Sequence, residues 1–229
     1  PTDGFDFDPS PDTVEGDYYK LDNVSDAIIA AYAAKLGNVV TSDDVFFCLY
    51  AQLHDPHYRE NYTADLKKVL PHVPPPPDRA RFENLVAWGR SLADLHVYYE
   101  NLEPYPLTVD VRKGFNRADR ETWRVSKMKW KSKTDHSTII YNPKVTISGI
   151  PDEAESYMLG SRSALGWIID RYQAKVDRAS GIANDPNDWC DEHDDPTYIV
   201  DLIGKITRVS VETMSIVDDI AESSQFVNT

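Results

Sequence analysis

The feature of the sequence that most clearly indicates binding is a run of basic residues near its middle, because such a run can bind a polyanion. Residues 112–133 include nine basic residues and two acidic ones, Asp119 and Glu121, a net charge of +7. The chain of 229 residues carries −14 as a whole, so the remainder carries −21. One basic patch on an acidic body favours an oriented contact over non-specific coating of a nucleic acid. The candidate binding residues are Arg112, Lys113, Arg117, Arg120, Arg124, Lys127, Lys129, Lys131 and Lys133.

The stretch 123–131 predicts how this patch is presented. If it is a strand, Met128 and Trp130 pack inward, whereas Lys127, Lys129 and Lys131 share the other face with Trp123 and Val125. Lysines on one strand face lie about 6.6–7 Å apart, a spacing that can follow phosphates. The arginines in the turn-rich sequence before it could enter a DNA groove, where arginine commonly reads guanine. The alternative is an edge strand that its lysines protect from aggregation.

Other residues of chemical interest are better explained without catalysis. Pro151-Asp152 and Gln173-Ala174-Lys175 resemble a Mg²⁺-dependent nuclease motif, but both halves fall in predicted helices, which favours coincidence. Cys190 and His193 supply at most half of a zinc site within an acidic loop that we expect to be solvated. We therefore expect no catalytic residue, metal site or cofactor in this chain.

Two further arginines have both a binding and a structural interpretation. Arg162 and Arg171 flank a short apolar helix and could contact phosphate, together with hydroxyls at the start of that helix. Pairing of Arg171 with Asp170 or with another carboxylate inside the fold is the interpretation that we favour. His96 lies on an apolar helical stripe and is expected to be a hydrogen-bonded core residue.

The first third of the chain predicts helices. Residues 25–36 form an apolar-rich segment ended by Gly37-Asn38, and Thr41 with Asp44 has the spacing of a capping box. Helices are also expected over 58–70, with a bend near 61–63, and over 79–101. The prolines at 74–77 predict an extended connector between these two.

The middle of the chain predicts strands, and the last third predicts helices again. Short β-branched or aromatic runs indicate strands at 107–112, 123–130, 137–141 and 145–148, with a turn at Asn142-Pro143. Helices are expected over 151–159, after Ser163, and from 198 to about 220, with an irregular loop at 180–195. The fold class is therefore α+β, with a small, mainly antiparallel sheet in the middle. We divide the chain into a linker (1–24), a helical subdomain (25–101) and a sheet-and-helix subdomain (102–229) that share one core.

Composition excludes several classes of protein. No apolar run reaches the roughly 18–20 residues that span a bilayer, and the acidic N-terminus does not resemble a signal peptide. Two cysteines provide neither a disulfide framework nor a four-cysteine zinc site. These features predict a cytoplasmic protein with no membrane partner.

Four stretches resemble the C-terminal specificity domain of Type ISP restriction–modification enzymes, which are often labelled helicases. They begin at Tyr50 (YAQLHDPHYRENYTADLKKVLPHVP), Gly89 (GRSLADLHVYYE), Ser137 (STIIYNPKVTISGIPDEAESYMLGSRSALGWIIDRYQAKVDRASGIANDPNDW) and Asp194 (DDPTYIVDLIGKITRVSVETMSIV). Together they cover most of residues 42–217, and the resemblance is weakest over the first 20 residues and over 114–123.

The resemblance implies that the chain reads a DNA site for a larger enzyme. In that family one polypeptide joins a nuclease, an ATP-driven translocase, an adenine methyltransferase and this domain. The sequence contains neither the glycine-rich phosphate loop nor the Asn-Pro-Pro-aromatic methyltransferase motif. ATP, Mg²⁺ and S-adenosylmethionine are therefore expected to serve other domains of the parent, which is also the expected protein partner. Individual base-contacting residues do not carry over.

Three functional hypotheses follow. The first is a DNA target-recognition module positioned by phosphate contacts from residues 112–133. The second is a structural coupler, in which the helical first third docks on the methyltransferase or motor and the sheet reads nothing. The third, an autonomous nuclease, rests only on the Pro151-Asp152 coincidence.

Overall fold

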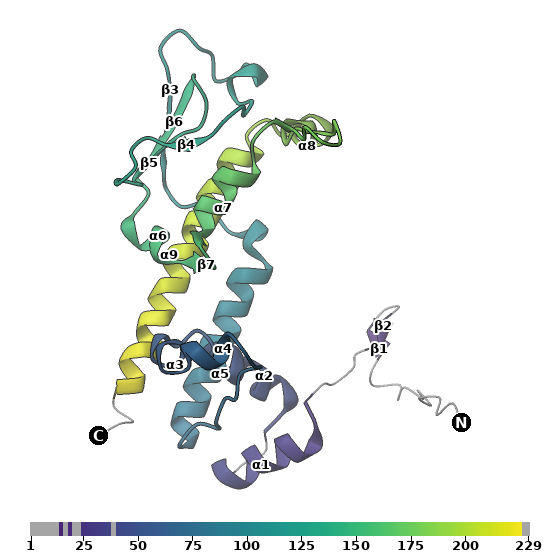
Figure 1. The fold of residues 1–229 in the computed structure, drawn as a ribbon, viewed down its shortest axis with the longest axis vertical. Helices are drawn as coiled ribbons and strands as arrows, with labels where there is room; N and C mark the ends of the chain where they lie inside the picture. The colour runs from purple at the N-terminus through teal and green to yellow at the C-terminus, as the bar shows by residue number, and fades with distance from the viewer. Residues whose placement is uncertain (1–13, 16–17, 20–23, 38–39, 226–229) are drawn as a thin grey trace.

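The computed structural model describes residues 14–15, 18–19, 24–37 and 40–225. Of the expected linker, only the two-residue strands β1 (Val14–Glu15) and β2 (Tyr18–Tyr19) and the single residue Val24 fall within them. The molecule is elongated, with helices at one end and a sheet at the other (Figure 1). This arrangement confirms the α+β fold class.

Within the residues that the structure describes, the first part of the chain forms five α-helices at the helical end, and their caps agree with the sequence. Gly37 adopts the left-handed conformation that ends the first helix, with φ of 72°. Thr41 and Asp44 form the predicted capping box. The predicted bend falls at Tyr62, between two short helices. The helices are α1 (Asp26–Leu36), α2 (Ser42–Gln52), α3 (Pro56–Asn61), α4 (Thr63–Leu66) and α5 (Arg79–Val97), followed by the 3₁₀ turn η2 (Tyr99–Asn101).

Helices α2 and α5 pack closely enough to require a glycine at their crossing. A Cβ atom built on Gly89 would lie 1.9 Å from the carbonyl oxygen of Phe47. Around this crossing, Tyr32, Val45, Phe82 and Leu85 form a buried cluster with neighbouring apolar side chains. Ile220, near the end of the last helix, belongs to the same cluster.

The other end is built on a four-stranded antiparallel sheet with the order β3-β6-β5-β4. Ile147 in the second strand of this order pairs with Val109 on one side and Ile139 on the other. The Asn142-Pro143 turn forms as predicted, with the Asn142 side chain accepting hydrogen bonds from the backbone of Lys144 and Val145. The strands are β3 (Thr108–Val111), β4 (Lys129–Trp130), β5 (Thr138–Ile140) and β6 (Val145–Ser148).

Helices and short hairpins complete this end of the molecule. The predicted helix at 151–159 is shorter than expected, because Tyr157 leaves the helical conformation and a hairpin follows. Ser163 caps the next helix as predicted, by accepting from the Gly166 amide at 3.0 Å. The elements are α6 (Asp152–Ser156), β7 (Met158–Leu159), β8 (Arg162–Ser163), α7 (Ala164–Arg171), β9 (Lys175–Val176), β10 (Ala183–Asn184), α8 (Asn187–Glu192) and α9 (Tyr198–Gln225).

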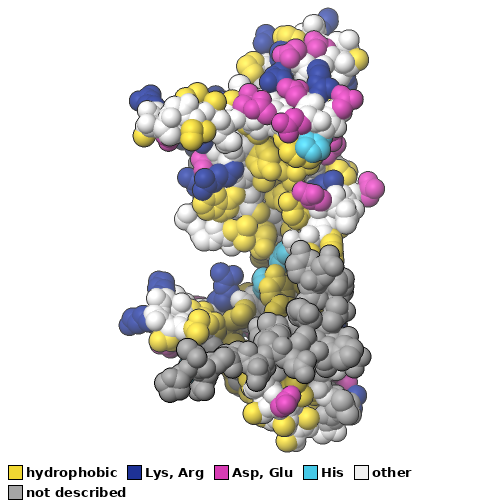
Figure 2. Space-filling model, turned by 90° about the vertical axis from the view of Figure 1, so that its right-hand side faces the viewer, with side chains coloured by type: hydrophobic (Ala, Val, Ile, Leu, Met, Phe, Trp, Pro, Cys, Tyr) yellow, Lys and Arg dark blue, Asp and Glu magenta, His cyan; other side chains and the backbone are white. Residues whose placement is uncertain are grey.

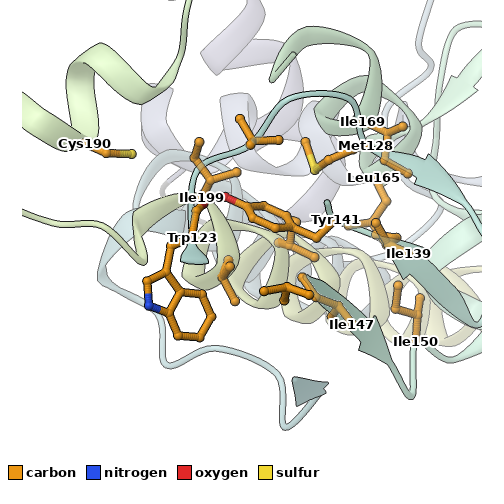
Figure 3. Close-up of a cluster of buried hydrophobic side chains, with 14 of the residues drawn as sticks. Trp123, Met128, Ile139, Tyr141, Ile147, Ile150, Leu165, Ile169, Cys190 and Ile199 are labelled. Carbon is orange, nitrogen blue, oxygen red and sulfur yellow. Dashed lines mark hydrogen bonds between the residues drawn. The ribbon is translucent and has the colours of Figure 1, made fainter. Parts of the chain in front are cut away.

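The sheet packs against α7 and α9 around a second buried cluster. Figure 3 shows Tyr141 in the middle of this cluster, among Trp123, Ile147 and Ile199. The Tyr141 hydroxyl donates a 2.6 Å hydrogen bond to the carbonyl of Trp123. This bond fixes part of the basic segment to the core.

Helix α9 joins the two clusters, since Ile199 lies in one and Ile220 in the other. Alongside it, His96 of α5 lies 2.7 Å from the Tyr50 hydroxyl and 3.0 Å from the Thr213 hydroxyl. His96 is thus the hydrogen-bonded residue that the sequence predicts, and burial lowers its pKa to about 4. The division of the chain at residues 101 and 102 stays a prediction.

Candidate nucleic-acid interface

The basic segment, residues 112–133, connects β3 with β5 and supplies the edge strand β4. Backbone hydrogen bonds hold its ends, from the Arg112 amide to Lys144 and from the Lys131 amide to Thr138. In between, the Asn142 side-chain amide donates to the carbonyls of Thr122 and Arg124 at 3.0 and 2.9 Å. The sheet therefore positions the segment, although most of the segment is not itself strand.

The predicted strand at 123–130 is wrong for most of its length. Only Lys129–Trp130 forms strand, and both Trp123 and Val125 are buried instead of facing outward with the lysines. The reason lies in tertiary contacts. The Asn187 side chain of α8 bonds both the amide and the carbonyl of Val125 at 2.8 Å, which turns this residue into the core.

The lysine row, Lys127, Lys129 and Lys131, is exposed as predicted. Met128 is buried between its members, and Trp130 packs inward on the His136 ring with centroids 4.5 Å apart. Within the described part of the chain, neither Lys127 nor Lys129 forms an ion pair. Hydrogen bonds from Ser137 are the main cause of the lowered pKa of Asp135, and the charge of Lys131 makes a smaller contribution. The row thus presents positive charge along a sheet edge.

Arg120 and Arg124 have a different environment from the lysines, because both point to carboxylates near α8. Arg124 lies 2.7 Å from Asp191 and 3.8 Å from Asp185. Arg120 lies 3.3 Å from Asp191 and also pairs with Asp194. The hydrogen bond from Arg124, followed by that from Arg120, lowers the pKa of Asp191. These two arginines join the basic segment to the acidic loop, and their charges are largely neutralised.

The remaining basic residues of the segment lie in its loops. Arg112, Lys113 and Lys133 are exposed, and their side chains form no ion pair with the residues that the structure describes. Arg117 donates to the carbonyl of Val109, and its guanidinium lies 5.8 Å from the centroid of the Trp123 ring. Figure 2 shows basic and acidic side chains intermingled at the sheet end of one face. The segment is therefore not a uniform positive strip.

Sequence reasoning left out one basic neighbour, Lys144. Its ammonium group donates to the carbonyl of Glu121 and lies 5.6 Å from the centroid of the Phe115 ring. It adds a positive charge beside the basic segment from the β5–β6 turn. The predicted turn at Asn142-Pro143 was the only feature of the sequence near Lys144. The sequence does not show that this turn packs against residues 121 and 122.

The acidic loop at 180–195 contains a helix that we did not predict. Helix α8 begins after Pro186, and the Asp185 side chain accepts a hydrogen bond from the Asn187 amide at 3.0 Å. Cys190 is buried on this helix, whereas His193 is exposed and stacks on Trp189 with centroids 4.0 Å apart. Among the described residues, no group of three His, Cys, Asp or Glu side chains is placed to hold a metal ion.

The predicted pairing of Arg171 with Asp170 is present, at 3.9 Å. Arg162 and Lys175 approach the same carboxylate, at 3.1 and 3.8 Å. Lys175, the last residue of the nuclease-like motif, is therefore ion-paired with Asp170. In the described ranges no helix has the length and apolar character needed to cross a bilayer.

Comparison with known proteins gives one family and several solved structures. Residues 7–202 match the model of the Type ISP C-terminal specificity domain. A nuclease-deletion mutant of the Type ISP enzyme LlaGI, in complex with a DNA substrate mimic, is 38% identical over 80% of this chain, with a TM-score of 0.68. The ATP-dependent Type ISP enzyme LlaBIII bound to DNA is 34% identical over 83%, with a TM-score of 0.71.

A third solved structure, the DrdV–DNA complex, is 28% identical over 87% of this chain, with a TM-score of 0.73. The matched regions cover only 14%, 12% and 20% of the LlaGI, LlaBIII and DrdV chains respectively. No curated protein matches the chain.

Proposed function

Because the chain belongs to the family of Type ISP C-terminal specificity domains, we propose that it recognises a DNA target sequence for a larger restriction–modification enzyme. The observation that carries this proposal is the lysine row, which is exposed on and beside the edge strand β4 and anchored to the core through Met128. Lysines in such an arrangement can bind successive phosphates, which fixes the position of a duplex but not its sequence. Similarity to two Type ISP enzymes solved with DNA or a DNA mimic supports the same role.

The five lysines of the segment, Lys113, Lys127, Lys129, Lys131 and Lys133, would supply the phosphate contacts. Arg120 and Arg124 would instead hold the segment in shape, because their guanidinium groups already bind carboxylates. Base reading would fall to side chains of the surrounding loops, among which Arg112 and Arg117 can form paired hydrogen bonds to guanine. The protein would thus use different residues to hold the basic segment in its conformation, to position the duplex and to read its base sequence.

The chain would not be an enzyme by itself. Its matches occupy at most a fifth of the solved relatives, so nuclease, translocase and methyltransferase activities would belong to other parts of a parent polypeptide in the cytoplasm. ATP, Mg²⁺ and S-adenosylmethionine would bind there. The partners of this chain would be double-stranded DNA and those domains.

A second role, docking on the parent's methyltransferase or motor, is favoured by an apolar surface on the helical end. Val97 and Tyr98 are 65% and 57% exposed at the end of α5. Beside them, Tyr98, Leu102 and Ile216 line a hollow of about 530 Å³ between α5 and α9. Both roles fit one protein, because this hollow and the lysine row are on different parts of the fold.

Selection from a pool of random DNA duplexes tests the proposed recognition. The chain is expected to enrich one short sequence. Binding without enrichment would leave only phosphate contact, and the absence of any duplex binding at low salt would contradict the proposal.

A further inference from the structure

A second group of basic side chains lies around Asp170 of α7, beside Trp167 and outside the basic segment. Arg162, Arg171 and Lys175 all lie within 4.0 Å of the carboxylate of Asp170. The pKa of Asp170 is lowered, first by the hydrogen bond from Arg162, so this carboxylate is ionised at neutral pH. It can neutralise only one of the three cations. This Trp167 cluster, as we call the three basic residues, therefore keeps two positive charges.

The cluster is held in place and open to solvent. The guanidinium groups of Arg162 and Arg171 lie 5.2 and 5.3 Å from the centroid of the Trp167 ring. The Trp167 indole in turn donates a 2.9 Å hydrogen bond to the Leu159 carbonyl. The side chains of Arg171 and Lys175 are nevertheless 70% and 51% exposed. Cations restrained in this way lose less side-chain entropy when they bind an anion.

Backbone contacts place the cluster beside the lysine row. The Ala174 amide, next to Lys175, donates a 3.2 Å hydrogen bond to the carbonyl of Ser126, next to Lys127. One residue earlier on the same segment, the Gln173 side chain donates to the carbonyl of Met128 at 3.4 Å. The two basic groups thus belong to neighbouring segments of the chain, although about 45 residues separate them in sequence.

An open hollow of about 480 Å³ lies between these segments. Its walls include Trp130 and His136 from the sheet edge, Arg162 from β8, and Asp170 and Gln173 from α7 and the residues that follow it. Arg162 of the Trp167 cluster brings positive charge to one wall of the hollow, which the carboxylates of Glu155 and Asp170 also line. Lys129 and Lys131 lie next to Trp130 of the opposite wall in sequence and are not among the residues that line the hollow.

We propose that the Trp167 cluster binds the sugar–phosphate backbone of the same duplex as the lysine row, so that the DNA contact continues from the sheet edge across the hollow onto α7. This inference rests on the proposed DNA-binding function. It assigns Arg171 and Lys175 as phosphate-contacting residues and Arg162 as the residue that neutralises Asp170. Asp170 sets how much charge the cluster offers.

The test measures how the affinity of the 229-residue chain for a random-sequence duplex depends on salt. Arg171→Gln with Lys175→Gln removes two contacts, so the log–log salt slope becomes shallower by about two units. The matched control is Lys67→Gln with Lys68→Gln, which removes the same charge from exposed positions after α4. This control keeps the wild-type slope. Asp170→Asn changes the charge in the opposite direction and strengthens binding.

The outcomes separate this inference from the proposed function. If the variant Lys127→Ala, Lys129→Ala, Lys131→Ala has a shallower slope and the Arg171→Gln, Lys175→Gln variant matches the Lys67→Gln, Lys68→Gln control, the Trp167 cluster does not bind the duplex and the proposed function stands. If the wild-type chain itself shows no salt-dependent binding, the proposed function fails as well. Circular dichroism of each variant establishes that the fold is kept.

Discussion

Arg124 and Asp191 lie 2.7 Å apart and join the basic segment to the acidic helix α8. Asp191 also pairs with Arg120, so one carboxylate binds the two arginines that bracket the turn before Val125. The pairing gives a physical reason for the opposite charges of two distant stretches of sequence. The acidic loop shapes the basic one, and the lysines beyond it remain free for a ligand.

Removing the Asp191 carboxylate is expected to have opposite effects on the stability of the fold and on its affinity for DNA. Asp191→Asn lowers Tm slightly, because exposed ion pairs contribute little to stability individually. The same change leaves Arg120 and Arg124 less neutralised, so affinity for a random-sequence duplex increases. Thermal unfolding and DNA binding of this variant measure both effects. A loss of affinity without a loss of structure would mean that Asp191 itself takes part in binding.

Asn187 is expected to be the most sensitive polar residue of the interface. Its side chain is 4% exposed and satisfies both backbone groups of Val125. Asn187→Ala leaves these buried groups unpaired, which costs about 2–4 kcal/mol of unfolding free energy. Urea denaturation measures this loss. The control Asn184→Ala, at an exposed position of β10, changes stability by less than about 0.5 kcal/mol. Equal effects of the two substitutions would contradict the assignment.

Replacing Gly89 by alanine is expected to destabilise the protein, although a glycine-to-alanine substitution in a helix usually stabilises it. At an exposed helical site Gly→Ala stabilises a protein by about 1 kcal/mol. Here the new methyl group meets the Phe47 carbonyl, so α2 and α5 must separate. Gly89→Ala therefore destabilises the chain by about 1–3 kcal/mol in chemical denaturation. A gain in stability would show that the two helices cross less closely than described.

The lowered pKa of His96 predicts that the folded chain becomes less stable in mild acid. Its pKa is about 4 in the folded chain against 6.5 for a free histidine, because burial disfavours the charged form. Between these two values the unfolded state binds a proton that the folded state does not. The contribution of His96 to the free energy of unfolding is therefore constant above about pH 6.5 and decreases below it, by up to about 1.4 kcal/mol per pH unit. Burial lowers the pKa of His54 in the same direction.

Urea denaturation between pH 4 and pH 7 checks this prediction. His96→Gln is expected to flatten the pH dependence, and His72→Gln, at an exposed histidine, serves as the control. The same slope in the His96→Gln variant and in the wild type would show that His96 does not cause the acid sensitivity.

Local signals in the sequence predicted most of the fold. The capping box at Thr41, the C-cap at Gly37 and the cap at Ser163 each depend on residues within four positions, and all three form. Strand β6 and the start of α9 agree with their predicted positions, because their apolar patterns face one core.

The basic segment was harder to predict, because residues far along the chain determine its shape. Nothing local to Val125 indicates that Asn187 turns it inward, and nothing local to Arg124 indicates that Asp191 neutralises it. Helix α8 was missed for the same reason: its buried residues Asn187 and Cys190 pack against partners from other elements. The number of basic residues could be read from the sequence, but their availability could not.

The salt dependence of DNA binding by the variant Lys127→Ala, Lys129→Ala, Lys131→Ala tests the central claim most directly. If the lysine row binds phosphates, this variant binds every duplex more weakly, and its log–log salt slope is shallower than that of the wild type by about three units. A slope equal to that of the wild type would contradict the claim that this row holds DNA.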